Sequence, residues 1–311
     1  MGNFVDLSII IPLYNEEDSL EELTNQIFQI LKQSDLSYEV CFVDDGSTDL
    51  SLAKIKELRR KYGSIKILSF RKNYGKSAAL SEGFKMASGK IIITMDADLQ
   101  DDPAEIPNLI KKMNEGYDLV SGWKKKRFDP ISKTLPSKLF NYFTALFTGI
   151  KIHDFNCGLK AYRHEVIKEI PIYGSLHRYL PVLAHWKGFA VGEIIVQHHA
   201  RKYGITKYGW RRFFDGFFDL FTVLFLTRYR QKPLHLFGFF GLASLTVGFL
   251  ISVYLTVLWF QGYGIGNRPL LFLGILLIIV GMQSFSIGLI GEMITNLKGE
   301  EGSYSIREKI L

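Results

Sequence analysis

The 311-residue sequence predicts an α/β domain built on a mostly parallel sheet, followed by a hairpin of two transmembrane helices. Three observations support this fold class. Short apolar runs alternate with helical patterns over about the first 125 residues, acidic motifs follow three of these runs, and two long apolar runs lie near the C-terminal end. A composition of 47% apolar and 22% charged residues excludes a disordered chain or a low-complexity fibre.

The elements of the first part follow one another at the spacing of βα units. The expected strands are Leu7–Leu13, Glu39–Val43, Ile65–Phe70, Lys90–Met95 and Asp118–Ser121. The expected helices are Glu17–Leu31, Leu50–Tyr62 with Asp49 as N-cap, Ser77–Met86, and Pro103–Asn114 with proline at its start. This alternation predicts a parallel sheet with helices on both faces. In such sheets, ligands bind at the carboxyl ends of the strands.

Three of the predicted strands end in acidic sequence. PLYNEE (Pro12–Glu17) follows the first strand, VDDGSTD (Val43–Asp49) the second, and MDADLQDDP (Met95–Pro103) the fourth. Carboxylates gathered at one sheet edge repel one another. They therefore need a cation, or hydrogen-bond donors from a ligand, at the same place.

Asp96 and Asp98 form the most informative motif. Two carboxylates at positions i and i+2 leaving a strand suit a hard divalent cation, Mg²⁺ or Mn²⁺, that bridges a diphosphate. Gln100 continues the spacing as a further ligand or a positioning residue. The alternative for an isolated Asp-x-Asp is a solvated acidic turn.

The other two motifs carry less information alone. Asp44, before a Gly-Ser turn, can accept hydrogen bonds from a nucleobase or ribose, and so can Glu16, while Tyr14 can pack on a base. The alternative is ordinary turn and helix-capping chemistry, with Ser47 or Asp49 capping the next helix.

Several classes of protein are excluded or disfavoured. No GxGxxG follows the first strand and no GxxxxGK[ST] occurs, which weakens dinucleotide-binding and P-loop interpretations. Two cysteines, Cys41 and Cys157, exclude a disulfide scaffold and a Cys₄ zinc site. A net charge of +7 indicates an anionic partner: nucleic acid, anionic lipid or a phosphorylated substrate.

The two long apolar runs predict transmembrane helices at about residues 234–260 and 269–291, in a segment 233–294. Arg268 is the only Lys, Arg, Asp or Glu between positions 233 and 291. Each run exceeds the ~20 residues needed to cross a bilayer core. Buried core helices are the alternative. Gly241-x-x-Ser244 and Gly281-x-x-Ser284 can pack these helices together or form a homo-oligomer.

The segment 206–232 is predicted to form amphipathic juxtamembrane helices. Eight Lys or Arg residues stand against two Asp residues between positions 201 and 232. By the positive-inside rule, both termini and the α/β domain are expected to face the cytoplasm. An aromatic face at the membrane interface is expected from Phe213, Phe214, Phe217, Phe218 and Phe221. The sequence therefore divides into four parts. These are the α/β domain (1–205), the amphipathic juxtamembrane helices (206–232), the two transmembrane helices (233–294) and a cytoplasmic tail (295–311).

Together the three acidic motifs resemble the family 2 glycosyltransferases. DADLQDDPAEIP resembles their polyisoprenyl-phosphate branch, which includes dolichyl-phosphate mannose synthase and bacterial glucosyltransferases with a C-terminal membrane hairpin. Further matches are NYGKSAALSEGFKMASG, LPSKLFNYF, HDFNCGLKAYRHEV and RKYGITKYGWRR, the last with Thr206 where the family usually has serine. The resemblance covers almost the whole chain and implies the GT-A fold.

The resemblance also implies roles for individual residues. Contacts to the nucleotide are implied for Pro12, Tyr14, Glu16, Asp44 and Asp96, and the metal site for Asp96, Asp98 and Gln100. Contacts to the lipid phosphate or diphosphate are implied for Arg127, Lys133, Ser137, Arg201 and Lys207. Direct roles in the reaction are implied for Asp154, Asp98, Arg127 and Lys207, with Asp154 as a sugar ligand or a base. For Arg127 and Lys133, the alternative is a solvated basic loop. For His198 and His199, a structural or lipid-head-group role is the alternative to a catalytic role.

The implied reaction transfers a sugar from a nucleotide donor, with UDP-glucose expected first, to a polyisoprenyl phosphate at the inner (plasma) membrane. It is expected to depend on Mg²⁺ or Mn²⁺ and to invert the anomeric centre. The partners are the donor, the lipid and the bilayer, with no nucleic acid. The alternatives are another donor such as GDP-mannose or another UDP-sugar, a processive polysaccharide synthase, or a non-catalytic membrane scaffold. No Gln-x-x-Arg-Trp motif of processive synthases is present.

Overall fold

A computed structural model describes residues 5–126, 131–170, 172, 176–200, 202–203, 222, 225, 232–266 and 268–297. The side chains of 131–136, 139 and 295–297 are outside this description. The chain divides into two compact units, one built on a sheet and one on helices α9 and α10. Most of the predicted amphipathic segment 206–232 lies outside the described residues, and so do residues 298–311 of the predicted tail 295–311.

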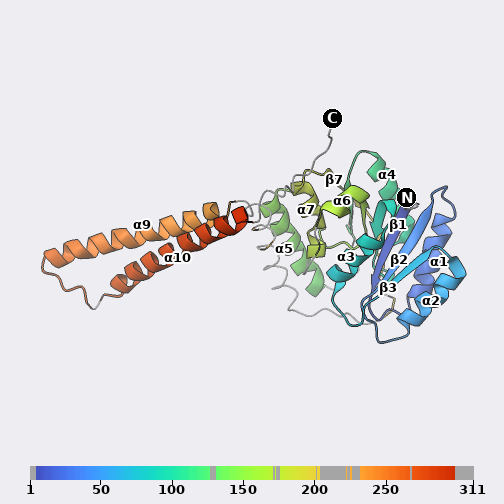
Figure 1. Cartoon of the computed structure of the whole chain (residues 1–311), viewed down its shortest axis with the longest axis horizontal. Coiled ribbons are helices and arrows are strands. Elements are labelled where there is room, and N and C mark those ends of the chain that lie inside the picture. The colour runs from blue at the N-terminus through green and yellow to red at the C-terminus, as the bar shows by residue number, and fades with distance from the viewer. Residues whose placement is uncertain are drawn as a thin grey trace. The chain divides into compact units, whose positions relative to one another are not determined.

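In the described part of the first unit, seven strands form one sheet in the order β3-β2-β1-β4-β6-β5-β7. The strands are β1 (Val5–Leu13), β2 (Tyr38–Asp44), β3 (Ile65–Ser69), β4 (Gly89–Thr94), β5 (Leu119–Trp123), β6 (Lys160–Arg163) and β7 (Val191–Ile195). Only β6 among them runs antiparallel to its neighbours. The predicted mostly parallel α/β fold is confirmed (Figure 1).

Helices cover both faces of this sheet. Their bounds are α1 (Leu20–Leu31), α2 (Ser51–Tyr62), α3 (Lys76–Met86), α4 (Ile106–Asn114), α5 (Ile131–Thr148), α6 (His164–Glu169) and α7 (Leu180–Trp186), with 3₁₀ turns η1 (Pro103–Glu105) and η2 (Leu176–Arg178). One buried cluster joins the sheet to α1, α2 and α4, and another joins it to α3, α6 and α7. Burial on both faces explains why the parallel strands are almost continuously apolar.

Several predicted boundaries need correction. The first helix begins at Leu20 instead of Glu17, because the residues before it form a loop. In this loop the Glu16 backbone N–H donates to Ser51 Oγ at 2.9 Å, and the Glu17 backbone N–H donates to Asp49 Oδ2 at 3.3 Å. The fourth begins with the 3₁₀ turn η1. Asp49 is not the N-cap of α2; Leu50 is, although the Asp49 carboxylate accepts a hydrogen bond from the Ser51 backbone N–H at 2.9 Å.

The second unit is a helical hairpin. Helices α9 (Pro233–Phe260) and α10 (Pro269–Leu297) are long and apolar enough to cross a membrane. Glycines bring the two backbones together: a Cβ on Gly241 would lie 2.9 Å from the Gly281 oxygen, and one on Gly248 2.8 Å from the Gly274 oxygen. Gly241 and Gly281, expected to pack helices, therefore pack against each other within the hairpin. The predicted homo-oligomer stays a prediction.

Candidate functional site

The loops after β1 and β2 are joined to each other. Asn15, which has a positive φ of 52°, donates its backbone N–H to Ser47 Oγ at 2.9 Å. Its side-chain Oδ1 accepts from the Thr48 backbone N–H at 2.8 Å. These contacts hold Tyr14 and Glu16, both partly exposed, beside the end of β2.

Asp44 and Asp45 both hold their own loops. Asp44 is buried, accepting from the Ser47 backbone N–H at 3.0 Å and from Ser69 Oγ at 2.7 Å. Asp45 accepts from the backbone N–H groups of Tyr74 and Gly75 at 2.7 and 2.8 Å, and burial raises its pKa. The structure thus gives Asp44 a turn-holding role, whereas its contact with a nucleotide stays a prediction.

The acidic loop after β4 brings the predicted metal residues together. Asp98 is 8% exposed, and its Oδ1 accepts from the Gln100 backbone N–H at 3.2 Å. The side chain of Asp96 is 32% exposed. Leu99, between Asp98 and Gln100, has a φ of 60°, which places its backbone in the left-handed region that few residues other than glycine adopt.

The buried Asp101 side chain holds the start of this loop in place. Its Oδ2 accepts from the Asp96 backbone N–H at 3.3 Å, and its Oδ1 lies 2.7 Å from Lys124 Nζ. Burial alone would lower the pKa of Lys124, but the neighbouring Asp101 carboxylate raises it well above its usual range. The two form a buried ion pair that fixes the start of the loop.

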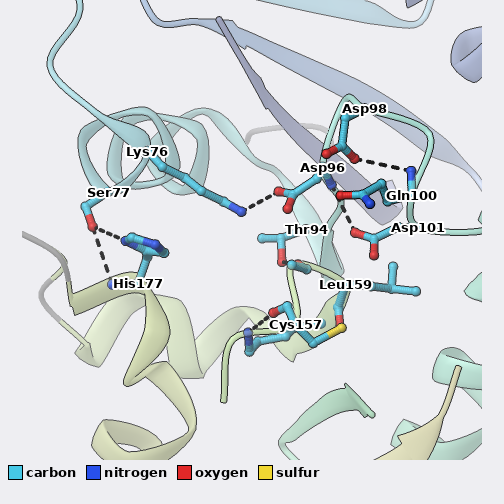
Figure 2. A network of polar contacts seen from close by, with 12 residues as sticks. Lys76, Ser77, Thr94, Asp96, Asp98, Gln100, Asp101, Cys157, Leu159 and His177 are labelled. Atoms are coloured by element: carbon cyan, nitrogen blue, oxygen red, sulfur yellow. Dashed lines mark hydrogen bonds and ion pairs between the residues drawn. The ribbon is translucent and has the colours of Figure 1, made fainter. Parts of the chain in front are cut away.

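A lysine from α3 reaches the exposed part of the loop. Lys76 is the first residue of α3, and its ammonium forms an ion pair with Asp96 Oδ1 (Figure 2). Burial would raise the pKa of Asp96, but Lys76, Lys124 and Lys160 hold it well below its ordinary value. Asp96 is therefore ionised at neutral pH.

The segment before β6 closes the opposite side of Asp96. A Cβ on Gly158 would lie 2.5 Å from Asp96 Oδ2 and 2.6 Å from its Cγ, so only glycine fits here without displacing the carboxylate. The Gly158 oxygen also accepts from Thr94 Oγ1 at 2.8 Å. Buried Lys160 donates to the carbonyls of Phe155 and Cys157, and burial lowers its pKa.

Asp154 lies in the same segment and is 1% exposed. Its Oδ1 accepts from the Asn156 backbone N–H at 3.1 Å, and its own N–H donates to Glu193 Oε1 at 3.1 Å. Asn156 Nδ2 lies 3.2 Å from Ser137 Oγ on α5. Two predicted residues, Asp154 and Ser137, are therefore both hydrogen-bonded to Asn156.

The pair His198-His199 follows β7 and lies beside the acidic loop. His198 is buried and forms a β-bridge with Asp101, while His199 lies 3.0 Å from Asp102 Oδ2. Burial raises the thiol pKa of Cys157 to about 12, so this cysteine is no nucleophile at neutral pH.

The remaining predicted residues are only partly placed. Pro12 is buried at the end of β1. Lys133 lies in α5, but its side chain is outside the described part of the structure, as are Arg127, Arg201 and Lys207 altogether. Within the described residues, no group of three or more His, Cys, Asp or Glu side chains is arranged to hold a metal ion.

Sequence reasoning missed four residues of this site: Lys76, Asp101, Lys124 and Gly158. Asp101 stands inside the quoted acidic motif, and Lys76 and Gly158 stand inside quoted matching segments. The signal was therefore present, but the fold alone brings these residues to Asp96.

Comparison with known proteins identifies the fold and family of this site. The family model described as "Glycosyl transferase family 2" matches residues 8–171, just over half of the chain. The chain belongs to glycosyl transferase family 2. The family resemblance of the acidic motifs is thereby confirmed, and the protein is a glycosyltransferase.

Relatives within family 2 extend over nearly the full chain. A dodecaprenyl-phosphate galacturonate synthase of Rhizobium johnstonii is 36% identical over 93% of this chain and 88% of its own length. An undecaprenyl-phosphate 4-deoxy-4-formamido-L-arabinose transferase of Pseudomonas aeruginosa is 35% identical over 93% and 85%. The expected donor UDP-glucose has no counterpart in these two names.

A solved structure with the same fold is glucosyl-3-phosphoglycerate synthase of Mycobacterium tuberculosis, in complex with Mn²⁺, UDP-glucose and phosphoglyceric acid. It has a TM-score of 0.55 and 18% identity, over 71% of this chain and 79% of its own. This similarity supports the GT-A fold of the family 2 domain.

Proposed function

We propose that this glycosyltransferase moves a sugar from a nucleoside diphosphate donor to a polyprenyl phosphate at the membrane. The observation that carries the proposal is the Asp96-x-Asp98 loop at the carboxyl end of β4. Because β4, β1 and β2 are parallel neighbours, this loop lies at the same sheet edge as the loops that follow β1 and β2. The acceptor class is that of the relatives, which are named for dodecaprenyl and undecaprenyl phosphates.

The acidic loop fits a divalent cation shared with the donor. Asp96 is ionised, and Asp98 and Gln100 follow it on one tight loop. Mg²⁺ commonly binds through one or two carboxylates plus substrate phosphates, so a closed cage of protein ligands is not required. When bound, Mg²⁺ or Mn²⁺ would neutralise charge on the departing diphosphate. The Mn²⁺ of the structural neighbour is consistent with this assignment.

The acceptor phosphate is already an anion and hardly needs a general base. The side chains of this chain must instead hold two anions together and orient them. Asp154 is buried and accepts a hydrogen bond from Asn156. It is suited to bind a sugar hydroxyl, or to hold Asn156 in its contact with Ser137. We assign phosphate binding to Ser137, Arg127, Lys133, Arg201 and Lys207. Direct displacement of the nucleotide by the acceptor phosphate inverts the configuration at the anomeric carbon.

The surface of α5 is suited to bind the apolar chain of a polyprenyl phosphate. Beyond Ser137, this helix exposes Tyr142, Phe143, Leu146 and Phe147. The hairpin α9–α10 anchors the enzyme in the inner (plasma) membrane, and the basic residues before it favour the cytoplasmic side.

The experiment is sugar transfer by the full-length protein purified in detergent, with polyprenyl phosphate, Mg²⁺ or Mn²⁺, and a panel of labelled donors. UDP-galacturonate and the formamido-arabinose donor are tested beside UDP-glucose and GDP-mannose. A lipid-linked monosaccharide from one donor, lost with chelator and in Asp96→Ala, is the expected result.

Other products would contradict the proposal in different ways. A polymer without lipid-linked monosaccharide would identify a processive synthase. Absence of both turnover and metal-dependent nucleotide binding would leave a membrane scaffold. Leu50→Ala, an exposed change at the start of α2, is the matched control and should keep full activity.

A further inference from the structure

The ion pair between Lys76 and Asp96 sets an ammonium group beside a predicted metal ligand. Lys76 begins α3 directly after Gly75, whose φ of 92° is in the left-handed region. The neighbouring Ser77 Oγ lies 2.8 Å from His177 Nδ1, which ties the start of α3 to η2 (Figure 2). Lys76 thus reaches Asp96 from a fixed start of the helix.

Asp96 has little room for two cations at once. The Gly158 backbone covers one side of its carboxylate, so that a Cβ there would lie within 2.8 Å of both oxygens. Lys76 contacts Oδ1, reaching the carboxylate from the start of α3 (Figure 2). An ammonium and a divalent ion on the same oxygen repel each other strongly at such short range.

We propose that Lys76 occupies the place of the divalent cation on Asp96 and is displaced when metal and donor bind together. The inference rests on the proposed function, since it takes Asp96 as a metal ligand. It makes Lys76 a positioning residue that keeps Asp96 charged, paired and in place in the donor-free enzyme. Metal alone then binds weakly, because it must first break the ion pair, and the donor diphosphate offers the released ammonium a new anionic partner.

The test measures Mn²⁺ binding to the full-length protein in detergent without nucleotide, by the electron paramagnetic resonance signal of free Mn²⁺. Lys76→Met removes the competing charge and should tighten Mn²⁺ binding about fivefold, the size of a partly exposed ion pair. Lys76→Gln repeats the charge loss with a polar side chain. Lys76→Arg keeps the charge and should stay within twofold of the unmodified protein.

Lys85→Met is the matched control, because it removes the same charge from the other end of α3, where Lys85 pairs with Glu82. It should leave Mn²⁺ affinity unchanged. A merely structural role for Lys76 would weaken Mn²⁺ binding in the neutral variants, so the sign of the change separates the two roles.

Unchanged or weaker Mn²⁺ binding in both Lys76→Met and Lys76→Gln would overturn the inference. Sugar transfer by the unmodified protein is measured separately. If transfer depends on Mn²⁺ while the two neutral variants bind Mn²⁺ no more tightly, the proposed role of Lys76 is wrong and the metal site is kept. If no variant binds Mn²⁺, with or without UDP, the proposed metal site is wrong as well.

Discussion

Gly158→Ala is the smallest change that should displace the Asp96 carboxylate without replacing an acidic residue. The new Cβ would lie 2.5 Å from Asp96 Oδ2, whereas ordinary contact begins at 3.4 Å. The Asp96 carboxylate therefore has to retreat by about 0.9 Å. Thr94, which donates to the Gly158 oxygen, holds the backbone in place, so the side chain has to move instead.

The cost should fall on the reaction and not on folding. A misplacement of about 1 Å in a positioned catalytic group costs about 10²-fold in rate, or about 2.7 kcal/mol of activation free energy. The carboxylate can rotate away at little conformational cost, so the melting temperature should change by only a few degrees. We expect a rate near one hundredth of that of the unmodified enzyme.

The assay is lipid-linked sugar formation at saturating donor, beside a thermal melt of the same sample. Gly264→Ala is the control, because a Cβ there meets nothing within 4 Å. A Gly158→Ala enzyme with more than a third of the normal rate and normal metal dependence would refute the assignment of Asp96. A collapsed melting curve would refute the claim that only the carboxylate moves.

Three further changes probe the rest of the molecule. Lys124→Met leaves the Asp101 carboxylate buried without its partner and should cost about 3–5 kcal/mol, seen as a lower melting temperature; an unchanged melt would contradict the buried ion pair. Cys157, with its thiol pKa raised to about 12, should resist alkylation at pH 8 until the protein is denatured, as mass spectrometry would show. Gly248→Leu should force the hairpin apart at the Gly274 oxygen, costing about 1–3 kcal/mol and increasing protease sensitivity; equal resistance would refute this packing.

The strand–helix alternation was enough to predict the fold because it is local. Each of the first five strands combines an apolar run with a neighbouring helix, so both signals lie within about 30 residues. β6 gave no such signal: it has four residues, KAYR, and runs antiparallel between β4 and β5. Its position depends on the order of strands in the sheet, which no local pattern encodes.

The same distinction separates the predicted site residues from the missed ones. Asp96 and Asp98 were found because they adjoin one strand, at its carboxyl end. Gly158 lies 62 positions after Asp96 and comes beside it only because β6 is inserted next to β4. Lys76 and Lys124 arrive from different elements, the start of α3 and the end of β5. Ordinary lysines and glycines carry no spacing that predicts such a meeting.

The sequence predicted that the clustered carboxylates need a positive charge nearby, and in the structure lysines of the protein itself supply it. Clustered carboxylates were expected to require a cation or a ligand's donors, and Asp96 and Asp101 do have cations beside them, from Lys76 and Lys124. The two pairs differ in a way that matters. Lys124 and Asp101 are buried together, so separating them would strand a charge. Lys76 and Asp96 are both partly exposed, so their pair can open when another cation arrives. The protein thus supplies one fixed cation for the fold and one exchangeable cation at the position where the donor's metal is expected.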